Sequence, residues 1–270
     1  MSVPRPPLSR AGIVSTLRAA GCVFAEDEAA LLLSTARTPD ELAAMVRRRT
    51  EGQPLEHVLG WAEFCGLRVA VDAGVFVPRR RTEFLARTAL ARARARADGG
   101  ARPVVVDLCC GTGAVGAALA TGLHGRLDLH AADLDPAAVR CARRNLAAVG
   151  TGRVHTGDLY APLPLSLRSR VDVLVANVPY IPTEDIPLLP QEARLHEART
   201  ALDGGADGLD VLRRVTAAAP RWLAPGGHLL VETSERQAPR AVGIFRAAGL
   251  LPQVVTCDDL DATVIVGRNP

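Results

Sequence analysis

Residues 104–116 read Val104-Val105-Val106-Asp107-Leu108-Cys109-Cys110-Gly111-Thr112-Gly113-Ala114-Val115-Gly116. The stretch begins with a short, mostly β-branched apolar run, which is typical of a buried parallel strand. Its three glycines then follow the G-x-G-x-x-G spacing expected between a strand and a helix. Glycine lets the backbone approach a ligand closely, and the start of a helix offers free N–H groups. The stretch therefore predicts a cofactor loop on a parallel α/β sheet, although its glycines alone do not identify the cofactor.

The residues from Pro103 onward alternate between strand and helix patterns, as in a doubly wound parallel sheet. The last two predicted strands are separated only by residues 258–261, a link that permits a hairpin but not a parallel crossover. A parallel sheet that ends in one antiparallel hairpin is the Rossmann-like, seven-stranded architecture of the class I S-adenosylmethionine-dependent methyltransferases. We therefore expect this α/β fold, with a tight turn over 224–228 before the fifth strand. The predicted strands are 103–108, 127–132, 152–156, 171–176, 227–232, 252–257 and 262–267, and the predicted helices are 113–122, 136–148, 207–222 and 236–248.

The N-terminal part of the chain has helical rather than alternating periodicity. Ser9 is placed to cap a first helix, and a capping box at Thr38, followed by a proline, opens a third. The helices expected here are 9–20, 26–36 and 38–49, followed by a hairpin over 63–77 and a helix over 82–97. We therefore divide the chain into an N-terminal helical domain that docks the substrate (1–75), a hairpin and helix linker (76–102) and a methyltransferase domain (103–270).

The composition argues against several classes of protein. All 32 basic residues are arginine, but the net charge is only +3, so stable binding to nucleic acid is not expected. No apolar stretch reaches the roughly 18 residues that cross a bilayer, and the first ten residues lack the apolar segment of a secretory signal. The six cysteines have no CxxC spacing and read as buried thiols in a reducing compartment. We expect a cytoplasmic monomer that does not bind membranes.

Three carboxylates after successive strands distinguish between the possible cofactors. Asp107 lies just before the glycines, where it would repel a pyrophosphate but suits the cationic amino-acid end of S-adenosylmethionine. Asp133 follows the second strand, where it can accept hydrogen bonds from ribose hydroxyls; the neighbouring Asp135 is the better helix cap because a proline follows it. Asp158 follows the third strand and is expected to bind an adenine amino group. Either cofactor offers ribose hydroxyls, but Asp107 and Asp158 favour S-adenosylmethionine over NAD.

A second informative stretch, residues 172–182, is an apolar strand that stops at Asn177-Val178-Pro179-Tyr180. Open α/β sheets place their chemistry at such carboxyl ends of strands. The tetrapeptide is similar to the [Asn/Asp/Ser]-Pro-Pro-[Tyr/Phe] motif of amino-group methyltransferases. The Asn177 side-chain oxygen and the Val178 carbonyl oxygen would hold the two N–H groups of an amide, while Pro179 and Tyr180 pack on its plane. Such alignment directs the nitrogen lone pair at the methyl group without a metal or a strong base.

With both motifs and the helical start, the chain resembles the protein-(glutamine-N5) methyltransferase family, the enzymes that methylate class I peptide chain release factors. Residues 52–60, 63–67 and 77–79 are similar to the family's stretch between its helical and catalytic domains. The resemblance implies S-adenosylmethionine as methyl donor, S-adenosylhomocysteine as product and a class I release factor as acceptor protein. It implies catalytic roles for Asn177, Val178, Pro179 and Tyr180, no metal, and a cofactor site made of Asp107, Cys109, Cys110, Gly111, Thr112, Gly113, Asp133, Leu134, Asp158, Leu159 and Asn177.

Departures from the family's pattern leave the acceptor open. Val178 replaces a proline, and Arg80 and Arg81 replace a proline and an acid. Val178 still precedes a proline and so favours extended geometry, which should preserve methyl transfer. The alternatives are adenine N6, another protein or a small molecule as acceptor, a non-catalytic module that binds S-adenosylmethionine, and, most remotely, a dehydrogenase.

Overall fold

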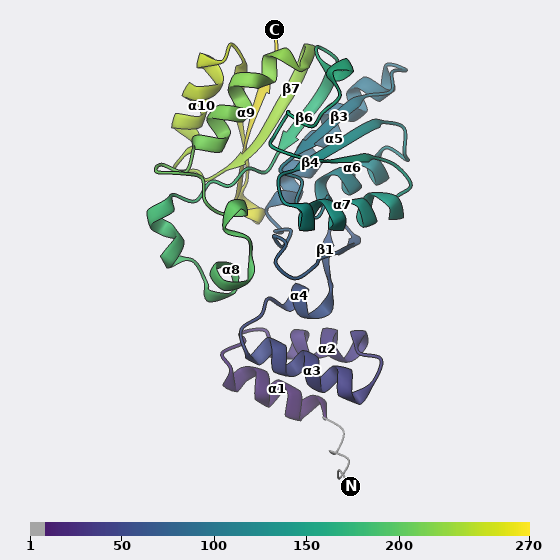
Figure 1. Cartoon of the computed structure of the whole chain (residues 1–270), viewed down its shortest axis with the longest axis vertical. Helices are drawn as coiled ribbons and strands as arrows, with labels where there is room; N and C mark the ends of the chain where they lie inside the picture. The colour runs from purple at the N-terminus through teal and green to yellow at the C-terminus, as the bar shows by residue number, and fades with distance from the viewer. Residues whose placement is uncertain (1–8) are drawn as a thin grey trace.

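The computed structural model describes residues 9–270. A small helical unit at the N-terminal end lies below a large α/β domain, and the C-terminus lies at the opposite end of the molecule (Figure 1). The helical unit consists of α1 (Arg10–Ala19), α2 (Ala25–Thr35) and α3 (Pro39–Thr50). Its apolar residues form a core of their own, which includes Ile13, Leu17, Ala29, Leu32, Met45 and Val58.

The ends of these helices follow the capping residues of the sequence. The Ser9 hydroxyl accepts a hydrogen bond from the Gly12 N–H, and the Thr38 hydroxyl accepts one from the Glu41 N–H. The Glu41 carboxylate in turn accepts from the N–H of Arg37, just before the helix. The two predicted helix starts are therefore confirmed.

The connection to the large domain differs from the sequence prediction. A short helix, α4 (Leu55–Leu59), was not predicted, because five residues are too few to show a helical period. The hairpin consists of β1 (Trp61–Phe64) and β2 (Leu67–Ala70), so the range 63–77 is wrong. Cys65 and Gly66 form its two-residue turn with φ of 50° and 74°. Val71, Val75 and Val77 lie in irregular chain; their alternation reflects burial against neighbouring elements.

The large domain contains a seven-stranded sheet of order β5-β4-β3-β6-β7-β9-β8. Only β9 runs antiparallel, pairing with β7 and β8, and this confirms the predicted methyltransferase architecture with its C-terminal hairpin. The strands are β3 (Val104–Leu108), β4 (Asp128–Asp133), β5 (Arg153–Thr156), β6 (Val171–Ala176), β7 (Leu223–Thr233), β8 (Leu251–Cys257) and β9 (Ala262–Arg268).

The turn predicted over 224–228 lies inside β7, so this prediction is corrected. The pairing of β6 with β7 shifts there, from Val171 opposite Leu223 to Val173 opposite His228. The intervening residues form a bulge in which Gly226 has a φ of 75°. A Cβ on Gly227 would lie 2.6 Å from the Val171 carbonyl oxygen, so this close approach requires glycine.

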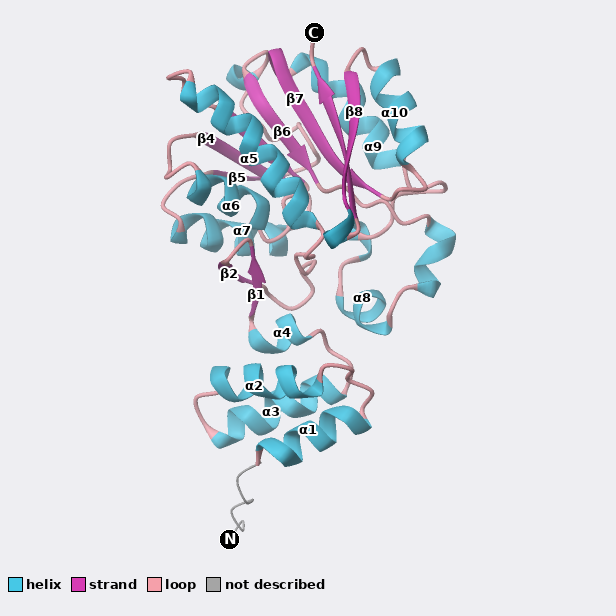
Figure 2. Ribbon diagram, turned by 180° about the vertical axis from the view of Figure 1, so that it is seen from behind, coloured by secondary structure: helices cyan, strands magenta, loops and turns pink. Residues whose placement is uncertain are grey.

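Helices cover both faces of the sheet (Figure 2). One layer contains α5 (Thr82–Asp98), α6 (Ala114–Gly122) and α7 (Pro136–Ala148), and the other contains α9 (Asp210–Ala218) and α10 (Ala238–Ala247). Leu85 and Ala89 of α5 are buried in the same core as α6 and the sheet. Through this packing, α5 joins the large domain although it precedes the first strand of the sheet. Short 3₁₀ helices occur at Leu165–Leu167, Ala219–Arg221 and Asp258–Leu260.

The chain between β6 and α9 contains short helices that the sequence analysis did not predict; we call this region the 183–203 segment. It contains the 3₁₀ helices η2 (Thr183–Leu188) and η3 (Arg199–Ala201) with the short helix α8 (Gln191–His196) between them. Its base is closed because the Ile181 N–H donates to the Leu202 carbonyl and the Gly204 N–H donates to the Ile181 carbonyl. In Figure 1 the segment lies between the sheet and the N-terminal helices. Its proline-interrupted turns are too short to show a helical period.

No helix within residues 9–270 is long and apolar enough to cross a membrane.

Candidate active site

A cavity of about 520 Å³ opens at the carboxyl ends of β3, β4 and β6. The loops after these strands form its floor, and the start of α5 and the 183–203 segment form its walls. Its size is that of a small-molecule site, and its place is where doubly wound sheets bind ligands. The predicted site residues that line it are Asp107, Cys109, Cys110, Gly111, Thr112, Asp133, Leu134, Asp158, Leu159, Asn177, Val178, Pro179 and Tyr180.

Gly113 is the one predicted site residue that does not line the cavity. It has a φ of 74°, and a Cβ there would lie 3.0 Å from the Cβ of Ala142 in α7. Glycine is therefore needed for close packing of the loop on α7. The loop turns sharply because Cys109 and Gly111 also have positive φ, of 53° and 54°. This conformation presents the backbone of the loop to the cavity.

Asp107 is a buried carboxylate at the base of the site, with an exposure of 2%. Its Oδ2 accepts a hydrogen bond of 3.0 Å from the N–H of Gly116 in α6. Burial raises the pKa of Asp107 to about 7. A carboxylate in this state gains stability from a nearby cation, so it fits the ammonium group of the predicted cofactor.

Asp133 holds the glycine loop. Its Oδ2 accepts from the Gly111 N–H at 2.8 Å, and its Oδ1 accepts from the Asp135 N–H at 2.9 Å. Burial raises the pKa of Asp133. Each oxygen has a second lone pair available, so the carboxylate can also accept from hydroxyl groups in the cavity. As expected, Asp135 is the residue that caps α7, accepting from the N–H of Ala137.

Asp158 has a partner that the sequence did not predict. The guanidinium of Arg214, from α9, forms an ion pair with Asp158, and both side chains line the cavity. The neighbouring Leu159 has a φ of 48°. Arg214 thus holds the carboxylate at the wall, which leaves its second oxygen for a ligand.

Asn177 and Val178 present two acceptors at the end of β6. The Asn177 Nδ2 donates to the hydroxyl oxygen of Thr82, the first residue of α5, over 3.3 Å. Within the described residues, no hydrogen bond reaches the Asn177 side-chain oxygen or the Val178 carbonyl oxygen. The Val178 side chain is buried in the core beneath. Both oxygens are therefore available to an N–H donor in the cavity.

The backbone of Pro179 and Tyr180 is held by the Gln237 side chain and by two closely packed glycines. The Gln237 Nε2 donates to the Tyr180 carbonyl oxygen at 3.0 Å. A Cβ on Gly204 would lie 2.8 Å from the Pro179 carbonyl oxygen, and one on Gly208 would lie 2.3 Å from that of Tyr180. Because two glycines pack directly on this peptide, the backbone position of Tyr180, which lines the cavity, is well defined.

The sequence prediction missed the residues that fasten the walls of the cavity. Glu197, in the 183–203 segment, receives both Nη2 hydrogen bonds of Arg79 at 2.6 and 2.7 Å and one from the Val77 N–H. Burial raises the pKa of Glu197. Arg81 and Thr82 also line the cavity. Their only sequence signal was their place in the stretch similar to the family's motif around 77–83.

Comparison with known proteins identifies the family. Residues 67–207 match the family described as methyltransferase small domain. A release factor glutamine methyltransferase from Geobacter sulfurreducens is 40% identical over 215 residues, covering 78% of this chain and 72% of the relative. A 4-amino-L-phenylalanine/4-methylamino-L-phenylalanine methyltransferase from Streptomyces pristinaespiralis is 41% identical over 206 residues, covering 76% and 69%.

Solved structures show the same fold at low sequence identity. A methyltransferase from Pyrococcus furiosus has a TM-score of 0.53 at 14% identity, covering 76% of this chain and 89% of its own. A ribosomal protein L11 methylase from Lactobacillus delbrueckii subsp. bulgaricus has a TM-score of 0.52 at 16% identity, covering 74% and 84%. The chain belongs to the release factor glutamine methyltransferase family of S-adenosylmethionine-dependent enzymes.

Proposed function

We propose that this protein methylates the side-chain amide nitrogen of a glutamine in a class I peptide chain release factor. The observation that carries the proposal is the pair of unengaged acceptors, the Asn177 Oδ1 and the Val178 carbonyl oxygen, at one end of the cavity. A primary amide offers two N–H donors from a single nitrogen, and two adjacent acceptors match that pattern. Curated relatives from several bacteria carry the name release factor glutamine methyltransferase.

The residues at the other end of the cavity suit S-adenosylmethionine. Asp107 supplies a buried anion for its ammonium group, and the left-handed loop at Cys109 and Gly111 supplies backbone contacts. Asp133 and Asp158 both line the cavity, where Asp133 would accept from the ribose hydroxyls and Asp158 from the adenine amino group. When bound, this cofactor supplies an electrophilic methyl group on a sulfonium.

The chain's own contribution to the reaction is alignment. An amide nitrogen is a poor nucleophile because its lone pair is delocalised into the carbonyl. Acceptance of both N–H groups by Asn177 and Val178 fixes the direction of the nitrogen and favours the positive charge that develops on it. Pro179 and Tyr180 pack against the amide plane, and the 183–203 segment restricts the access of water.

Mass spectrometry of a class I release factor tests the proposal directly. Incubation with this protein and S-adenosylmethionine should add one methyl group to one glutamine. A release factor with that glutamine replaced by asparagine is the matched control, because it keeps the amide but shortens the reach. An unmodified release factor in the presence of bound cofactor would contradict the proposed acceptor.

A free amino acid with an aromatic amine is the second candidate acceptor. One relative is named as a methyltransferase of 4-amino-L-phenylalanine. In addition, Arg81 lines the cavity and, unlike Arg79, forms no ion pair with another described residue, so it can receive a substrate carboxylate. Two results together would support this acceptor: the protein methylates 4-aminophenylalanine, and Arg81→Met loses that activity while release factor methylation is unchanged.

The N-terminal helices are proposed to dock the acceptor protein, with 1–75 as the docking domain, 76–102 as a linker whose helix α5 packs on the large domain, and 103–270 as the methyltransferase domain. Supporting this, the helices have a separate core, and Pro54 and Glu56 line the cavity from their side. Hydrogen–deuterium exchange should show slower exchange in α1–α3 when a release factor is added. We further propose that the enzyme is a cytoplasmic monomer without stable binding to membranes or nucleic acid. Sedimentation of the purified protein tests whether it is a monomer.

A further inference from the structure

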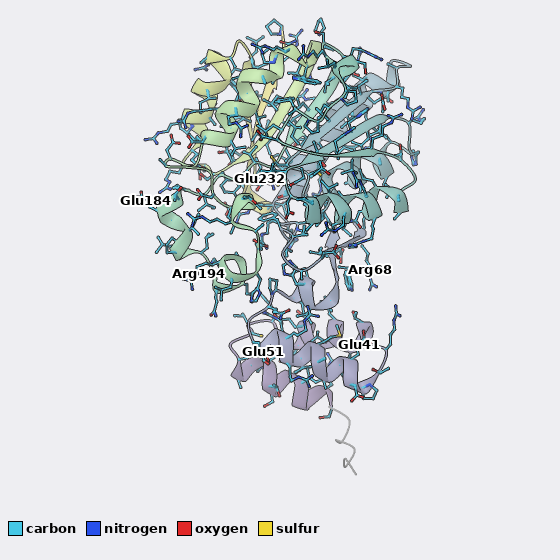
Figure 3. The ribbon with its side chains drawn as sticks, viewed as in Figure 1. Glu41, Glu51, Arg68, Glu184, Arg194 and Glu232 are labelled. Atoms are coloured by element: carbon cyan, nitrogen blue, oxygen red, sulfur yellow. The ribbon has the colours of Figure 1, made fainter. Side chains whose placement is uncertain are left out.

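Glu232 is a buried carboxylate with no assigned role in the proposed methyl transfer. It lies near the end of β7, is 2% exposed, and its Oε2 has no hydrogen-bond partner among residues 9–270. Figure 3 places it in the interior of the large domain, whereas Glu184 and Arg194 of the 183–203 segment lie at the outside. A buried, incompletely paired carboxylate costs stability, so its presence beside the cavity calls for a physical explanation.

The sheet places Glu232 beside the catalytic motif. Strands β6 and β7 are parallel neighbours, with Ala176 opposite Val231. The next residues along the two strands are Asn177 and Glu232, which therefore lie side by side at the same edge of the sheet. Thr82, 3% exposed, begins α5 above them and receives the hydrogen bond from Asn177.

The Thr82 hydroxyl connects the two side chains. Its oxygen accepts from the Asn177 Nδ2, so its own proton must go to another acceptor. Burial raises the pKa of Glu232, while a hydrogen bond from Thr82 and the charges of Arg81 and Arg79 act in the opposite direction. The Glu232 carboxylate lies beside Asn177 in the strand register, and its Oε2 is unpaired among residues 9–270, so it is the acceptor placed to take the Thr82 proton.

The direction of this proton decides how Asn177 is oriented. A hydroxyl without a fixed acceptor can donate to the Asn177 oxygen as readily as it accepts from the nitrogen. The amide could then turn over and present its NH₂ group to the cavity. The Glu232 carboxyl group offers an acceptor oxygen in either protonation state, so it can take the hydroxyl proton and keep the hydroxyl lone pair facing the Asn177 nitrogen.

We infer that Glu232 is a positioning residue that acts through Thr82 to keep the Asn177 side-chain oxygen facing the methyl acceptor. The inference deepens the proposed function and rests on it for the identity of the acceptor. Glu232 itself contacts neither the cofactor nor the acceptor in this scheme. The chain therefore holds its catalytic amide through residues of three separate elements, β6, β7 and α5.

Four variants separate positioning from a structural role. Thr82→Val removes the hydroxyl, and Glu232→Gln replaces the carboxylate with an amide that can donate as well as accept, so neither variant has a hydrogen bond of fixed direction. Thr82→Ser keeps this hydrogen bond. Thr233→Val is the matched control, because Thr233 is the next residue of β7 and also has a buried hydroxyl without a partner among the described residues. Its side chain points to the other face of the strand. Binding of S-adenosylhomocysteine, measured by calorimetry, should stay within about twofold in all four if the fold is intact.

The kinetic test uses the split between kcat and KM on a release factor glutamine. We expect kcat to fall by roughly 10- to 100-fold in Glu232→Gln and Thr82→Val, with KM nearly unchanged, because binding survives but alignment does not. Thr82→Ser and Thr233→Val should retain activity. The double variant Glu232→Gln/Thr82→Val should be no slower than Thr82→Val alone, since both act on the same contact.

A second readout needs no acceptor. The side-chain NH₂ signals of Asn177 in protein labelled with ¹⁵N-asparagine can be assigned by their loss in Asn177→Asp. These signals should shift and exchange faster with water in Glu232→Gln and Thr82→Val but not in Thr82→Ser or Thr233→Val. Unchanged signals and unchanged kcat in Glu232→Gln would overturn the inference. Shifted signals in Glu232→Gln and Thr82→Val, together with a wild-type enzyme that fails to methylate glutamine, would overturn the proposed acceptor and leave the positioning role standing.

Discussion

The guanidinium of Arg49 in α3 contacts the carboxylate of Glu192 in α8, with Nη1 and Oε1 2.6 Å apart. Arg49 also forms two hydrogen bonds to Glu28 of α2, at 2.6 and 3.0 Å, and one to the Gln53 carbonyl oxygen. These contacts raise the pKa of Arg49 well above its usual range. One buried side chain thus joins the N-terminal helices to the segment that covers the cavity.

Replacing Arg49 with methionine should destabilise the protein by about 3–5 kcal/mol, because Glu28 would remain buried without its partner. The double variant Arg49→Met/Glu28→Leu should recover most of this loss. Glu192→Gln is the control; since Glu192 is 44% exposed, its removal should cost at most about 1 kcal/mol. Urea denaturation followed by circular dichroism measures all three. A loss below 1 kcal/mol in Arg49→Met would show that the buried pair contributes little.

Asp133→Ala should weaken binding of S-adenosylhomocysteine by about 1–3 kcal/mol. The variant loses the proposed ribose contact and also releases the N–H groups of Gly111 and Asp135. Calorimetry gives the affinity. Asp135→Ala is the matched control, because it removes the cap of α7 but leaves the loop contact to Gly111. Equal affinities in wild type and Asp133→Ala would remove Asp133 from the cofactor site.

Asn177→Ala should reduce methyl transfer by about 10²–10³-fold while the fold is retained, because the amide acceptor loses one preorganised partner. Single-turnover transfer of labelled methyl groups measures the rate, and thermal unfolding checks the fold. Wild-type rates in this variant, on any acceptor found, would disprove the alignment mechanism.

Val178→Pro should retain activity on a release factor glutamine. The acceptor at this position is a backbone carbonyl, which proline also possesses, and the residue before Pro179 is already biased to extended geometry. If Val178 instead serves another acceptor, the variant will lose activity on that substrate and gain it on glutamine. Parallel single-turnover assays on a release factor and on 4-aminophenylalanine distinguish the two results.

Stability should depend on pH through Asp107, whose pKa burial raises from 3.8 to about 7. Between these values the unfolded chain releases a proton that the folded, unliganded protein keeps. The free energy of unfolding contributed by this group therefore falls as the pH rises from about 4 to about 7 and is constant above. Urea titrations at pH 5 and pH 7 should show this decrease in wild type and a smaller one in Asp107→Asn. Equal pH slopes would show that Asp107 ionises normally in the folded state.

The sequence by itself determined the sheet, its C-terminal hairpin and the cavity residues that follow the strands of the sheet. These features have local signals, such as β-branched runs, glycines before a helix, capping residues and the short link between the last two strands. Since parallel strands deliver their carboxyl ends to one edge, naming the residues after each strand was enough to collect Asp107, Asp133, Asp158 and Asn177 in one place.

Only the tertiary structure decided how those residues are held. Thr82 lies 95 residues from Asn177, Arg79 lies 118 residues from Glu197, and Arg49 lies 143 residues from Glu192. The 183–203 segment and the bulge in β7 likewise have conformations set by what they pack against. A periodic sequence pattern does not predict such partners, because a hydrogen bond or ion pair between distant positions does not change the pattern of neighbouring residues in the sequence. The sequence therefore specified which side chains follow the strands at the floor of the cavity, while packing of α5, β7 and α8 around it specified its walls.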